Sequence, residues 1–492
     1  MASLSKTYQQ EKLLGQIYTP DFIVAKILDE VGYDGSVVLG KKILDPACGD
    51  GRFLCQVAQR LIKYSPKETL KQNLEQMYGW DIDENAVQLC RENLEKLVQD
   101  LDLVIDWNIS QKNALHTITS YEKTFDFIVG NPPYIRIQHL ELEERIFLQN
   151  EYKFCKKGST DIYIAFYELC THLLKNTGIC GLITPNTFFF TQTGQSLRQY
   201  FGEEKNIVSI CNYSNIQVFE NATTYSAIVI FGKVARESFR YEQAIALHEF
   251  AKRQISFAEI SSENSWQLSV EENTQNNGVK LKDICKIHVG ITTLADAVFI
   301  MKYIKTENDL IHLQAKNGEI IIVEKTVTKP IIKASKLKKS DEEITEYVIF
   351  PYEKEANKTK VIAEAVLQEK YPLAYQYLLS VKDVLDKRDN GKPNKAAWYA
   401  FGRSQGLETS FGKKILFSPM NSLPNFIYSA NEEATFYSGY CIKYNGDYQW
   451  LLSKLNSEHL AAFMARSSRD FRGGWKAYNK TVLEQYVLPE EV

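Results

Sequence analysis

The sequence lacks the features that mark membrane, secreted and zinc-binding proteins. Its nine cysteines are scattered along 492 residues without a Cys-x-x-Cys pair, so they are expected to be reduced thiols and no metal site is predicted. No apolar run approaches the ~20 residues that cross a bilayer. The segment Met1–Lys12 is polar and lacks the apolar core of a signal peptide. These absences favour a cytoplasmic protein that contacts no membrane.

A strong excess of charge of either sign is also missing. The chain carries 58 Lys and Arg against 61 Asp and Glu, a net charge of -3. This balance neither suggests nor excludes a polyanionic partner, because binding to phosphates depends on local basic surface rather than on the sum over the chain.

Short apolar runs alternate with amphipathic stretches from about residue 41 to residue 233. Helical spacing of apolar residues predicts helices at Phe53–Tyr64, Glu84–Gln99 and Ile162–Leu174. The runs between them predict seven strands: Lys42–Leu44, Met77–Trp80, Leu103–Asp106, Phe125–Val129, Gly181–Thr184, Ile207–Asn212 and Ala227–Phe231. This alternation is typical of an α/β sheet, mostly parallel, with ligand sites at the carboxyl ends of its strands.

The pattern changes in the second half of the chain. After about residue 240, short strands and aromatic-rich loops predominate, with helices predicted at Lys360–Leu379 and Ser457–Ser467. A length of 492 residues also exceeds what one core usually organises. We therefore predict a first domain at 1–240, a linker at 241–277 and a mixed α+β domain at 278–492.

The first candidate ligand loop follows the first predicted strand and reads Asp45-Pro46-Ala47-Cys48-Gly49-Asp50-Gly51. Its glycines allow the backbone to approach a ligand closely. The loop is neither Gly-x-Gly-x-x-Gly nor a phosphate-binding loop, and its two acids disfavour a pyrophosphate. They suit a cationic, zwitterionic ligand, whose ammonium faces a carboxylate while backbone N–H groups bind its own carboxylate.

Polar residues also follow the next two predicted strands. Asp81 ends the second strand, where a carboxylate of a nucleotide-binding sheet accepts both ribose hydroxyls, and Ile82 is placed to cover an adenine face. Asn113 follows the third strand and is a candidate for the adenine amino edge. The structural alternatives are a helix cap for Asp81, a role that Asp83 fits better, and a turn residue for Asn113.

The strongest motif is Asn131-Pro132-Pro133-Tyr134, which follows a buried strand. An exocyclic amine on a heteroaromatic ring is a poor nucleophile because its lone pair is delocalised. The Asn131 amide oxygen and the Pro132 carbonyl, held rigidly by consecutive prolines, can accept its two hydrogens and direct its lone pair at a methyl group. Tyr134 offers a face on which a planar base can stack. The motif therefore predicts amine methylation.

Together these motifs resemble the gamma-class (TaqI-like) N6-adenine DNA methyltransferases of restriction–modification systems. The order of the two loops matches that family, and three further segments resemble family motifs: Gly15-Gln16-Ile17-Tyr18-Thr19-Pro20, Asp161-Ile162-Tyr163 with Phe166, and Ala222-Thr223-Thr224-Tyr225-Ser226-Ala227. The resemblance is specific over about residues 14–235 and loose over 278–490.

The resemblance implies a Rossmann-like class I methyltransferase sheet, S-adenosyl-L-methionine as the cofactor, and flipped adenine in double-stranded DNA as the substrate. Residues 1–240 would be the catalytic methyltransferase domain and 278–492 the DNA target-recognition domain. The implied cofactor contacts are Thr19, Pro20, Asp45, Ala47, Gly49 and Asp81, and the implied target-base contacts are Asn131, Pro132, Tyr134 and Tyr225. The family often has Asp where this chain has Asn113, although an amide oxygen can serve the same hydrogen bond.

Basic and aromatic residues are interleaved in the second half, a composition suited to contact with DNA phosphates. The candidate DNA-contacting residues there are Lys333, Lys336, Arg403, Arg469, Arg472 and Trp475. For each patch taken singly, a solvated lysine face beside core aromatics is the better reading. Several such patches attached to this catalytic half favour DNA contact.

Other substrates use the same chemistry. N4-cytosine methylation would employ the same two acceptors, and enzymes that methylate protein glutamine or guanine in ribosomal RNA share the Asn-Pro-Pro-Tyr motif but usually lack a large C-terminal region. A DNA-specificity subunit with an inactive core is the non-enzymatic alternative, disfavoured by intact Asp45, Asp81, Asn131 and Tyr134. We expect a monomer without a fused nuclease, so that any cognate restriction endonuclease is a separate chain.

Overall fold

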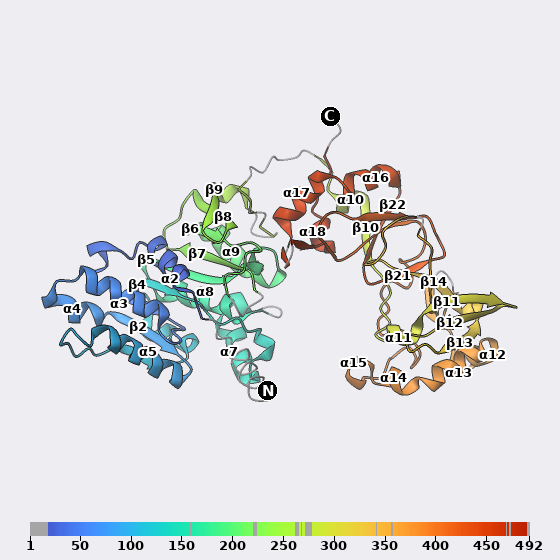
Figure 1. Cartoon of the computed structure of the whole chain (residues 1–492), viewed down its shortest axis with the longest axis horizontal. Coiled ribbons are helices and arrows are strands. Elements are labelled where there is room, and N and C mark those ends of the chain that lie inside the picture. The colour runs from blue at the N-terminus through green and yellow to red at the C-terminus, as the bar shows by residue number, and fades with distance from the viewer. Residues whose placement is uncertain are drawn as a thin grey trace. The chain divides into compact units, whose positions relative to one another are not determined.

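The computed structural model divides the chain into two compact units, Met1–Asn273 and Thr274–Val492 (Figure 1). It describes residues 18–156, 160–219, 224–260, 265, 266, 268–270, 278–340, 342–355, 358–468, 470, 471 and 474–489. Within these residues no helix is long and apolar enough to cross a membrane, and all nine cysteines are free thiols.

The first unit is built on a nine-stranded sheet with the strand order β3-β2-β1-β4-β5-β7-β6-β8-β9. The strands are β1 (Ile43–Asp45), β2 (Met77–Asp81), β3 (Asn108–Gln111), β4 (Phe125–Gly130), β5 (Leu174–Pro185), β6 (Ile207–Asn212), β7 (Ser226–Phe231), β8 (Ser238–Ala246) and β9 (Glu249–Ser256). The first five strands in this order, β3 to β5, run parallel to one another. Strand β7 is antiparallel to both of its neighbours, and β8 is parallel to β6. The α/β sheet is therefore mostly parallel at its centre, but it has nine strands rather than the predicted seven.

The two additional strands occupy the segment predicted to be a linker. β8 and β9 form an antiparallel hairpin that extends the sheet to Ser256, so the predicted boundary at residue 240 and the start of the linker at 241 are wrong. The error has a physical cause, because a carboxylate interrupts the apolar pattern of β8. Glu242 is buried and forms ion pairs with Lys26 and Lys252, each at 3.1 Å.

The third strand also begins later than predicted. Residues 103–106 form no strand, and β3 starts at Asn108, opposite Tyr78 of β2. Asp102 has a left-handed backbone, with φ 50°, and the indole N–H of buried Trp107 donates to Glu95 of α5 at 2.6 Å. This hydrogen bond fastens the returning chain to the preceding helix, and pairing with β2 begins only beyond it.

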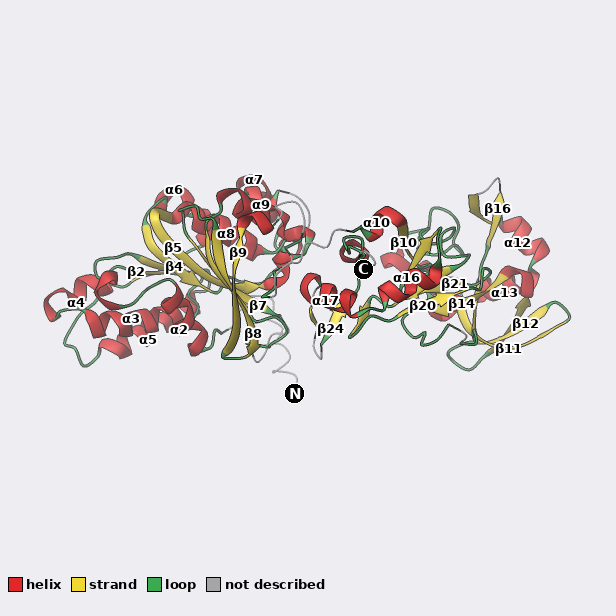
Figure 2. Cartoon of the chain, turned by 90° about the horizontal axis from the view of Figure 1, so that it is seen from above, coloured by secondary structure: helices red, strands yellow, loops and turns green. Residues whose placement is uncertain are grey.

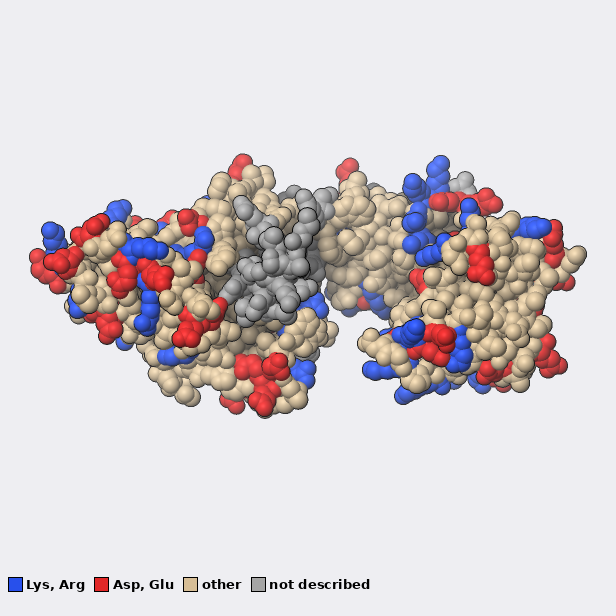
Figure 3. All heavy atoms as spheres, turned by 60° about the horizontal axis from the view of Figure 1, so that its bottom comes forward, with Lys and Arg blue, Asp and Glu red and all other residues tan. Residues whose placement is uncertain are grey.

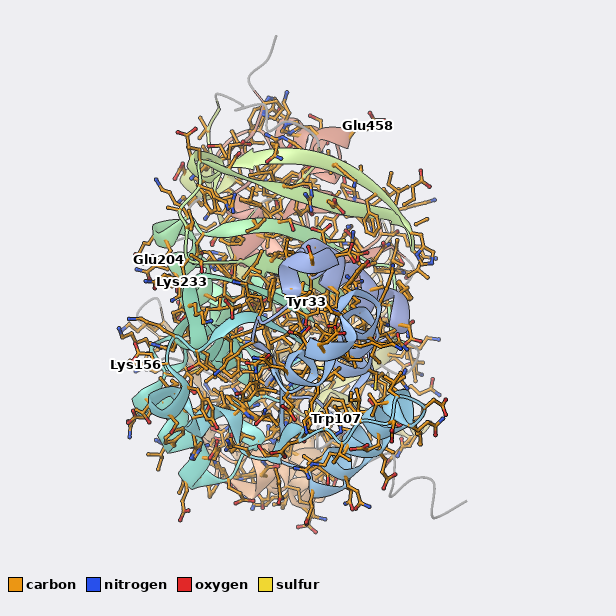
Figure 4. The ribbon with its side chains drawn as sticks, turned by 90° about the vertical axis from the view of Figure 1, so that its left-hand side faces the viewer. Tyr33, Trp107, Lys156, Glu204, Lys233 and Glu458 are labelled. Atoms are coloured by element: carbon orange, nitrogen blue, oxygen red, sulfur yellow. The ribbon has the colours of Figure 1, made fainter. Side chains whose placement is uncertain are left out.

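Helices cover both faces of the sheet (Figure 2). One face carries α2 (Asp21–Glu30), α3 (Arg52–Tyr64), α4 (Lys67–Leu74) and α5 (Glu84–Val98), and the other carries α6 (Ile118–Tyr121), α7 (Leu142–Glu151), α8 (Ile162–Leu173) and α9 (Gln195–Glu204). The predicted helices correspond to α3, α5 and α8. Because successive side chains of a strand point to opposite faces, Ile128 and Val129 belong to different cores. Tyr33 and Trp107, labelled in Figure 4, are buried on the α2–α5 side.

The second unit combines sheets whose strand pairs are antiparallel, except for the parallel pair β14–β21, with short helices. Its sheets have the orders β10-β22-β18-β20, β13-β12-β11-β15-β14-β21, β16-β17 and β19-β24-β23. The strands are β10 (Cys285–Val289), β11 (Ile300–Glu307), β12 (Leu310–Gln314), β13 (Ile320–Glu324), β14 (Thr328–Lys333), β15 (Glu346–Ile349), β16 (Tyr352–Glu355), β17 (Lys358–Val361), β18 (Lys414–Phe417), β19 (Met420–Asn421), β20 (Phe426–Ser429), β21 (Thr435–Tyr437), β22 (Tyr440–Tyr444), β23 (Asp470–Phe471) and β24 (Trp475–Ala477). This mixture is the α+β organisation expected for the second half.

The helices of the second unit are α10 (Leu281–Ile284), α11 (Asp296–Phe299), α12 (Glu364–Lys370), α13 (Pro372–Ser380), α14 (Lys382–Asp386), α15 (Arg388–Gly391), α16 (Tyr448–Leu455), α17 (Glu458–Ser467) and α18 (Lys480–Leu483). α17 confirms the predicted helix at Ser457–Ser467, with the Ser457 side chain as its N-cap. The single helix predicted at Lys360–Leu379 is wrong, because it is split into α12 and α13. Pro372 cannot continue the preceding helix, and Tyr371 between the two is non-helical.

Candidate active site

A cavity of about 360 Å³ lies at the carboxyl ends of the central strands of the first unit. Its walls come from the ends of β1 and β2 and from the segments that follow β1, β2, β3 and β4, namely residues 45–50, 81–83, 112–115, 131, 133 and 135. This is the edge of a parallel α/β sheet where ligands bind, because the loops at this edge converge.

The cavity brings together most of the residues singled out in the sequence. Lining it are Thr19, Asp45, Ala47, Gly49, Asp81, Ile82, Asn113 and Asn131. Pro20, Pro132 and Tyr134 are not among its lining residues, although their neighbours Thr19 and Pro133 are. Among the described residues, no group of three or more His, Cys, Asp or Glu side chains is placed so that it could hold a metal ion.

The loop after β1 holds a buried carboxyl group. Asp45 is 1% exposed and accepts a hydrogen bond from the Ala47 backbone N–H at 3.1 Å. Burial, with smaller contributions from the charges of Asp81 and Asp50, raises the pKa of Asp45 to about 8. Gly49 and Gly51 have φ values of 52° and 89°, so the tight turn requires residues that tolerate a left-handed backbone. The site therefore favours a cationic guest, which would stabilise the ionised carboxylate.

Asp81 links the first loop to the second. Its Oδ2 accepts a hydrogen bond from the Gly49 backbone N–H at 2.9 Å, and its Oδ1 accepts one from the Asp83 N–H at 3.0 Å. Asp83, in turn, accepts from the Asn85 N–H and caps α5, as its position predicts. Asp81 is thus a residue of the cavity wall and not the helix cap.

The third wall joins Asn113 to a residue that the sequence motifs do not indicate. The Asn113 amide oxygen accepts a hydrogen bond from the Leu115 N–H at 3.1 Å, and its amide nitrogen donates to Glu144 Oε1 at 3.2 Å. Glu144 lies on α7 and lines the cavity. In the sequence, its only signal is an acidic cluster at the start of a helix, which is common for electrostatic reasons alone. In contrast to these polar groups, Ile82 adds an apolar surface to the cavity, where its side chain is 60% exposed.

The Asn-Pro-Pro-Tyr loop leaves the end of β4 and is fixed on both sides. The Asn131 amide nitrogen donates to the Thr19 hydroxyl at 3.1 Å, so its amide oxygen lies on the other side of the amide carbon. The Tyr134 hydroxyl donates to the Ile183 carbonyl at 3.2 Å, and its ring makes edge contacts with Tyr163 and Phe219. Residue 135 and residue 162 are joined by a backbone hydrogen bond of 2.8 Å, which ties this loop to the start of α8.

The segment expected to pack a flipped base is described only in part. Ala222 and Thr223 lie outside the described residues, as do Gly15, Gln16 and Ile17 of the N-terminal motif. Tyr225 is half-buried directly before β7, and its carbonyl accepts a hydrogen bond from the Asn186 N–H at 2.9 Å.

The candidate DNA-contacting residues of the second unit have varied surroundings. Lys333 ends β14, with its ammonium 5.5 Å from the centre of the Tyr437 ring, and Lys336 is exposed. The Arg403 guanidinium donates to both carboxylate oxygens of Asp389, at 3.2 and 3.1 Å. Trp475 is 44% exposed on β24. Arg469 and Arg472 lie outside the described residues.

Charge on the surface is mixed. On the face shown in Figure 3, acidic and basic side chains are interspersed over the first unit, and Lys and Arg gather along parts of the second unit with acidic side chains among them. This distribution agrees with the small net charge of -3 and leaves local basic surface on the second unit.

Comparisons with known proteins relate the chain to restriction–modification methylases. Residues 75–219, which contain Asp81, Asn113 and Asn131, match the family described as Eco57I restriction-modification methylase. The chain is 26% identical to the Type II restriction enzyme and methyltransferase RM.Eco57I of Escherichia coli, over 96% of this chain and 56% of that protein. It is 25% identical to the Type II methyltransferase M.BanIII of Aneurinibacillus aneurinilyticus, over 92% of this chain and 83% of that protein.

One solved structure shares the fold over nearly the whole chain. The Type IIL restriction-modification enzyme MmeI, solved in complex with DNA, superposes with a TM-score of 0.60 at 13% identity. The superposition covers 98% of this chain and 65% of the MmeI chain. The chain thus spans a little over half of RM.Eco57I and about two thirds of MmeI, but most of M.BanIII.

Proposed function

We propose that this protein is a DNA methyltransferase that transfers a methyl group from S-adenosyl-L-methionine to the N6 amino group of adenine in double-stranded DNA. One observation carries the proposal: Asp45, Asp81 and Asn131 line a single cavity at the carboxyl edge of the sheet. The similarity of the chain to two Type II methyltransferases over more than nine tenths of its length supports DNA as the substrate.

The residues of the cavity fit the proposed cofactor. Asp45, with its raised pKa of about 8, suits the cationic methionine end, and Asp81 lies where the ribose hydroxyls of a nucleoside bind. Exposed Ile82 offers an apolar surface to the adenine ring. When bound, the cofactor would supply a methyl group on a sulfonium sulfur, and this sulfur would leave as a neutral thioether without activation by the protein.

Asn131 and Pro132 would prepare the target amine. The hydrogen bond from Asn131 to Thr19 leaves the amide oxygen of Asn131 to face away from Thr19, and we assign this oxygen and the Pro132 carbonyl as acceptors for the two amine hydrogens. With both hydrogens held by these acceptors, the nitrogen lone pair would point at the methyl group that the cofactor supplies, and the new N–C bond would form as the methyl carbon–sulfur bond breaks. The methylated nitrogen would carry the positive charge that the sulfonium loses and would give one of its protons to solvent, so no strong base is required.

The target base must leave the duplex to reach this loop. An amine within a base pair is not accessible, so enzymes that modify bases extrude them into a pocket. Tyr134 and Tyr225 are the proposed aromatic contacts of the flipped base. The second unit, with Lys333, Lys336, Arg403 and Trp475, is proposed to recognise the DNA. A monomer and a separately encoded restriction endonuclease remain predictions of the sequence.

The test is transfer of labelled methyl from S-adenosyl-L-methionine to unmethylated duplex DNA, with ribosomal RNA and total protein as parallel substrates. The expected result is label in DNA, lost in Asn131→Ala and retained in Asn150→Ala, an exposed residue of α7. Label in RNA or protein alone would replace DNA as the substrate and refute the role assigned to the second unit.

A further inference from the structure

The carboxylate at the third wall of the cavity belongs to Glu144. An Asp at position 113 would present only acceptors, whereas Asn113 uses its amide oxygen for the Leu115 N–H and its amide nitrogen for Glu144. The side chain that offers a carboxylate to the cavity at this wall is therefore Glu144, on a different element. The pairing of these two residues is visible only in the structure, because Glu144 follows Asn113 by 31 residues.

Glu144 contacts two polar side chains and also lines the cavity. Its Oε1 accepts from Asn113 Nδ2 at 3.2 Å, and its Oε2 lies 3.1 Å from His116 Nε2. These contacts fix the carboxylate at two points, and the side chain is 26% exposed. A carboxylate has about four acceptor positions, so these two contacts leave acceptor capacity for a ligand.

The surroundings of this carboxylate suit a flat ring that carries an amine. Ile82 and Leu89, 60% and 40% exposed, line the same cavity and offer apolar surface. Apolar walls with a few fixed polar groups select a ligand by its shape and by the positions of its donors. At the Asn113–Glu144 wall, an acceptor-only group selects a donor, which adenine presents as its exocyclic amine.

We propose that Glu144 determines the specificity of the cavity for the adenine ring of the cofactor by accepting a hydrogen bond from its exocyclic amine, with Asn113 as the residue that positions the carboxylate. The inference rests on the proposed function, because it assumes a nucleoside cofactor. It also connects the cofactor to the catalytic loop, since α7 directly follows the segment that contains Asn131 and Tyr134.

The test compares the binding of S-adenosylhomocysteine with that of its 6-oxo analogue, S-inosylhomocysteine, by titration calorimetry. The analogue replaces the amine by a carbonyl, which would face the carboxylate of Glu144 and leave both groups unpaired. A site built to hydrogen-bond a substrate group discriminates strongly against its absence, so the wild type should prefer the adenine ligand by more than about tenfold.

Glu144→Gln should lower this preference to less than about threefold, because an amide can donate to the 6-oxo group. The double variant Asn113→Asp, Glu144→Gln returns a carboxylate to the wall and should restore the preference. Glu143→Gln, a neutralised neighbour that is exposed on the same helix, should leave it unchanged.

The outcomes separate the inference from the proposed function. If the wild-type preference survives in Glu144→Gln, or if this variant weakens both ligands equally, Glu144 only holds α7 in place and the inference fails alone. If neither ligand binds the wild type, the proposed function fails as well.

Discussion

The amide nitrogen of Asn131 donates to the hydroxyl of Thr19 at 3.1 Å, although the two residues are 112 positions apart in the chain. This hydrogen bond joins the Asn-Pro-Pro-Tyr loop to the segment before α2. It fixes which end of the amide faces Thr19 and turns the amide oxygen, the proposed acceptor for the target amine, away from it. The orientation of the Asn131 amide thus depends on a residue outside its own loop.

Replacement of this acceptor should slow methyl transfer. Thr19→Val keeps the shape of the side chain but removes the hydroxyl, so the Asn131 amide loses a hydrogen bond worth about 1 kcal/mol and can rotate. We expect a roughly five- to tenfold lower single-turnover rate at saturating cofactor. Thr19→Ser should retain the wild-type rate, and equal rates in both variants would show that the hydrogen bond does not orient Asn131.

Substitutions of Asp81 and Asn131 should affect different steps, the first cofactor binding and the second turnover. Asp81→Ala removes the carboxylate that accepts from Gly49 at 2.9 Å and should weaken binding of the cofactor by more than about tenfold, the usual scale for a hydrogen bond to a charged group. Asn131→Ala should nearly abolish turnover while binding survives. Titration calorimetry and single-turnover assays measure the two effects, and an equal loss of cofactor binding in both variants would contradict the assigned roles.

Cofactor binding should release a proton from Asp45. The folded carboxyl, whose pKa is raised to about 8, holds its proton at neutral pH, whereas the unfolded one ionises near 3.8. Between these values the folded state binds more protons, so this group's contribution to the free energy of unfolding falls as pH rises. A cationic ligand favours the carboxylate, and its affinity should therefore rise with pH up to about 8.

Calorimetry at pH 7 in buffers of different ionisation enthalpy measures this release. The wild type should release about one proton more than Asp45→Asn on binding S-adenosyl-L-methionine, and the variant should lose the corresponding rise of affinity between pH 6 and 8. Identical proton release in the two proteins would show that Asp45 does not face the cation.

The turn after β1 should tolerate no side chain at Gly51. A Cβ there would meet Cys90 Sγ at 2.6 Å in a backbone with φ 89°, so Gly51→Ala should lower the free energy of unfolding by about 2–4 kcal/mol through strain and overlap. Gly40→Ala is the matched control, since its φ of 71° is similar but its Cβ would meet nothing within 4 Å. It should cost only about 1 kcal/mol. Equal losses in the free energy of unfolding for the two variants, measured by urea unfolding, would contradict the predicted overlap.

The part of the cavity wall formed by residues at the ends of the strands was predictable from the sequence. Asp45, Asp81 and Asn131 each come directly after a buried apolar run, and parallel strands bring such positions to one edge of the sheet. The same local pattern identifies α3, α5 and α8 through their helical spacing. These features depend on neighbours in the chain, which a sequence displays.

Features that depend on distant contacts were not predictable. Glu144 enters the cavity only because α7 folds back onto the turn after β3, and Thr19 meets Asn131 from the far end of the first unit's chain. Strand β8 was missed because buried Glu242 is neutralised by Lys26, which lies 216 residues earlier. In each case a polar residue acquires its role from a partner that local periodicity does not reveal.

The most direct test of the proposed adenine methylation is the identity of the methylated nucleoside. Unmethylated duplex DNA is incubated with the protein and labelled S-adenosyl-L-methionine, digested to nucleosides and separated by chromatography with mass detection. Label in N6-methyladenine is expected. Label in N4-methylcytosine would preserve the amine chemistry of Asn131 and Pro132 but contradict adenine as the target, and DNA without label would contradict the proposed function.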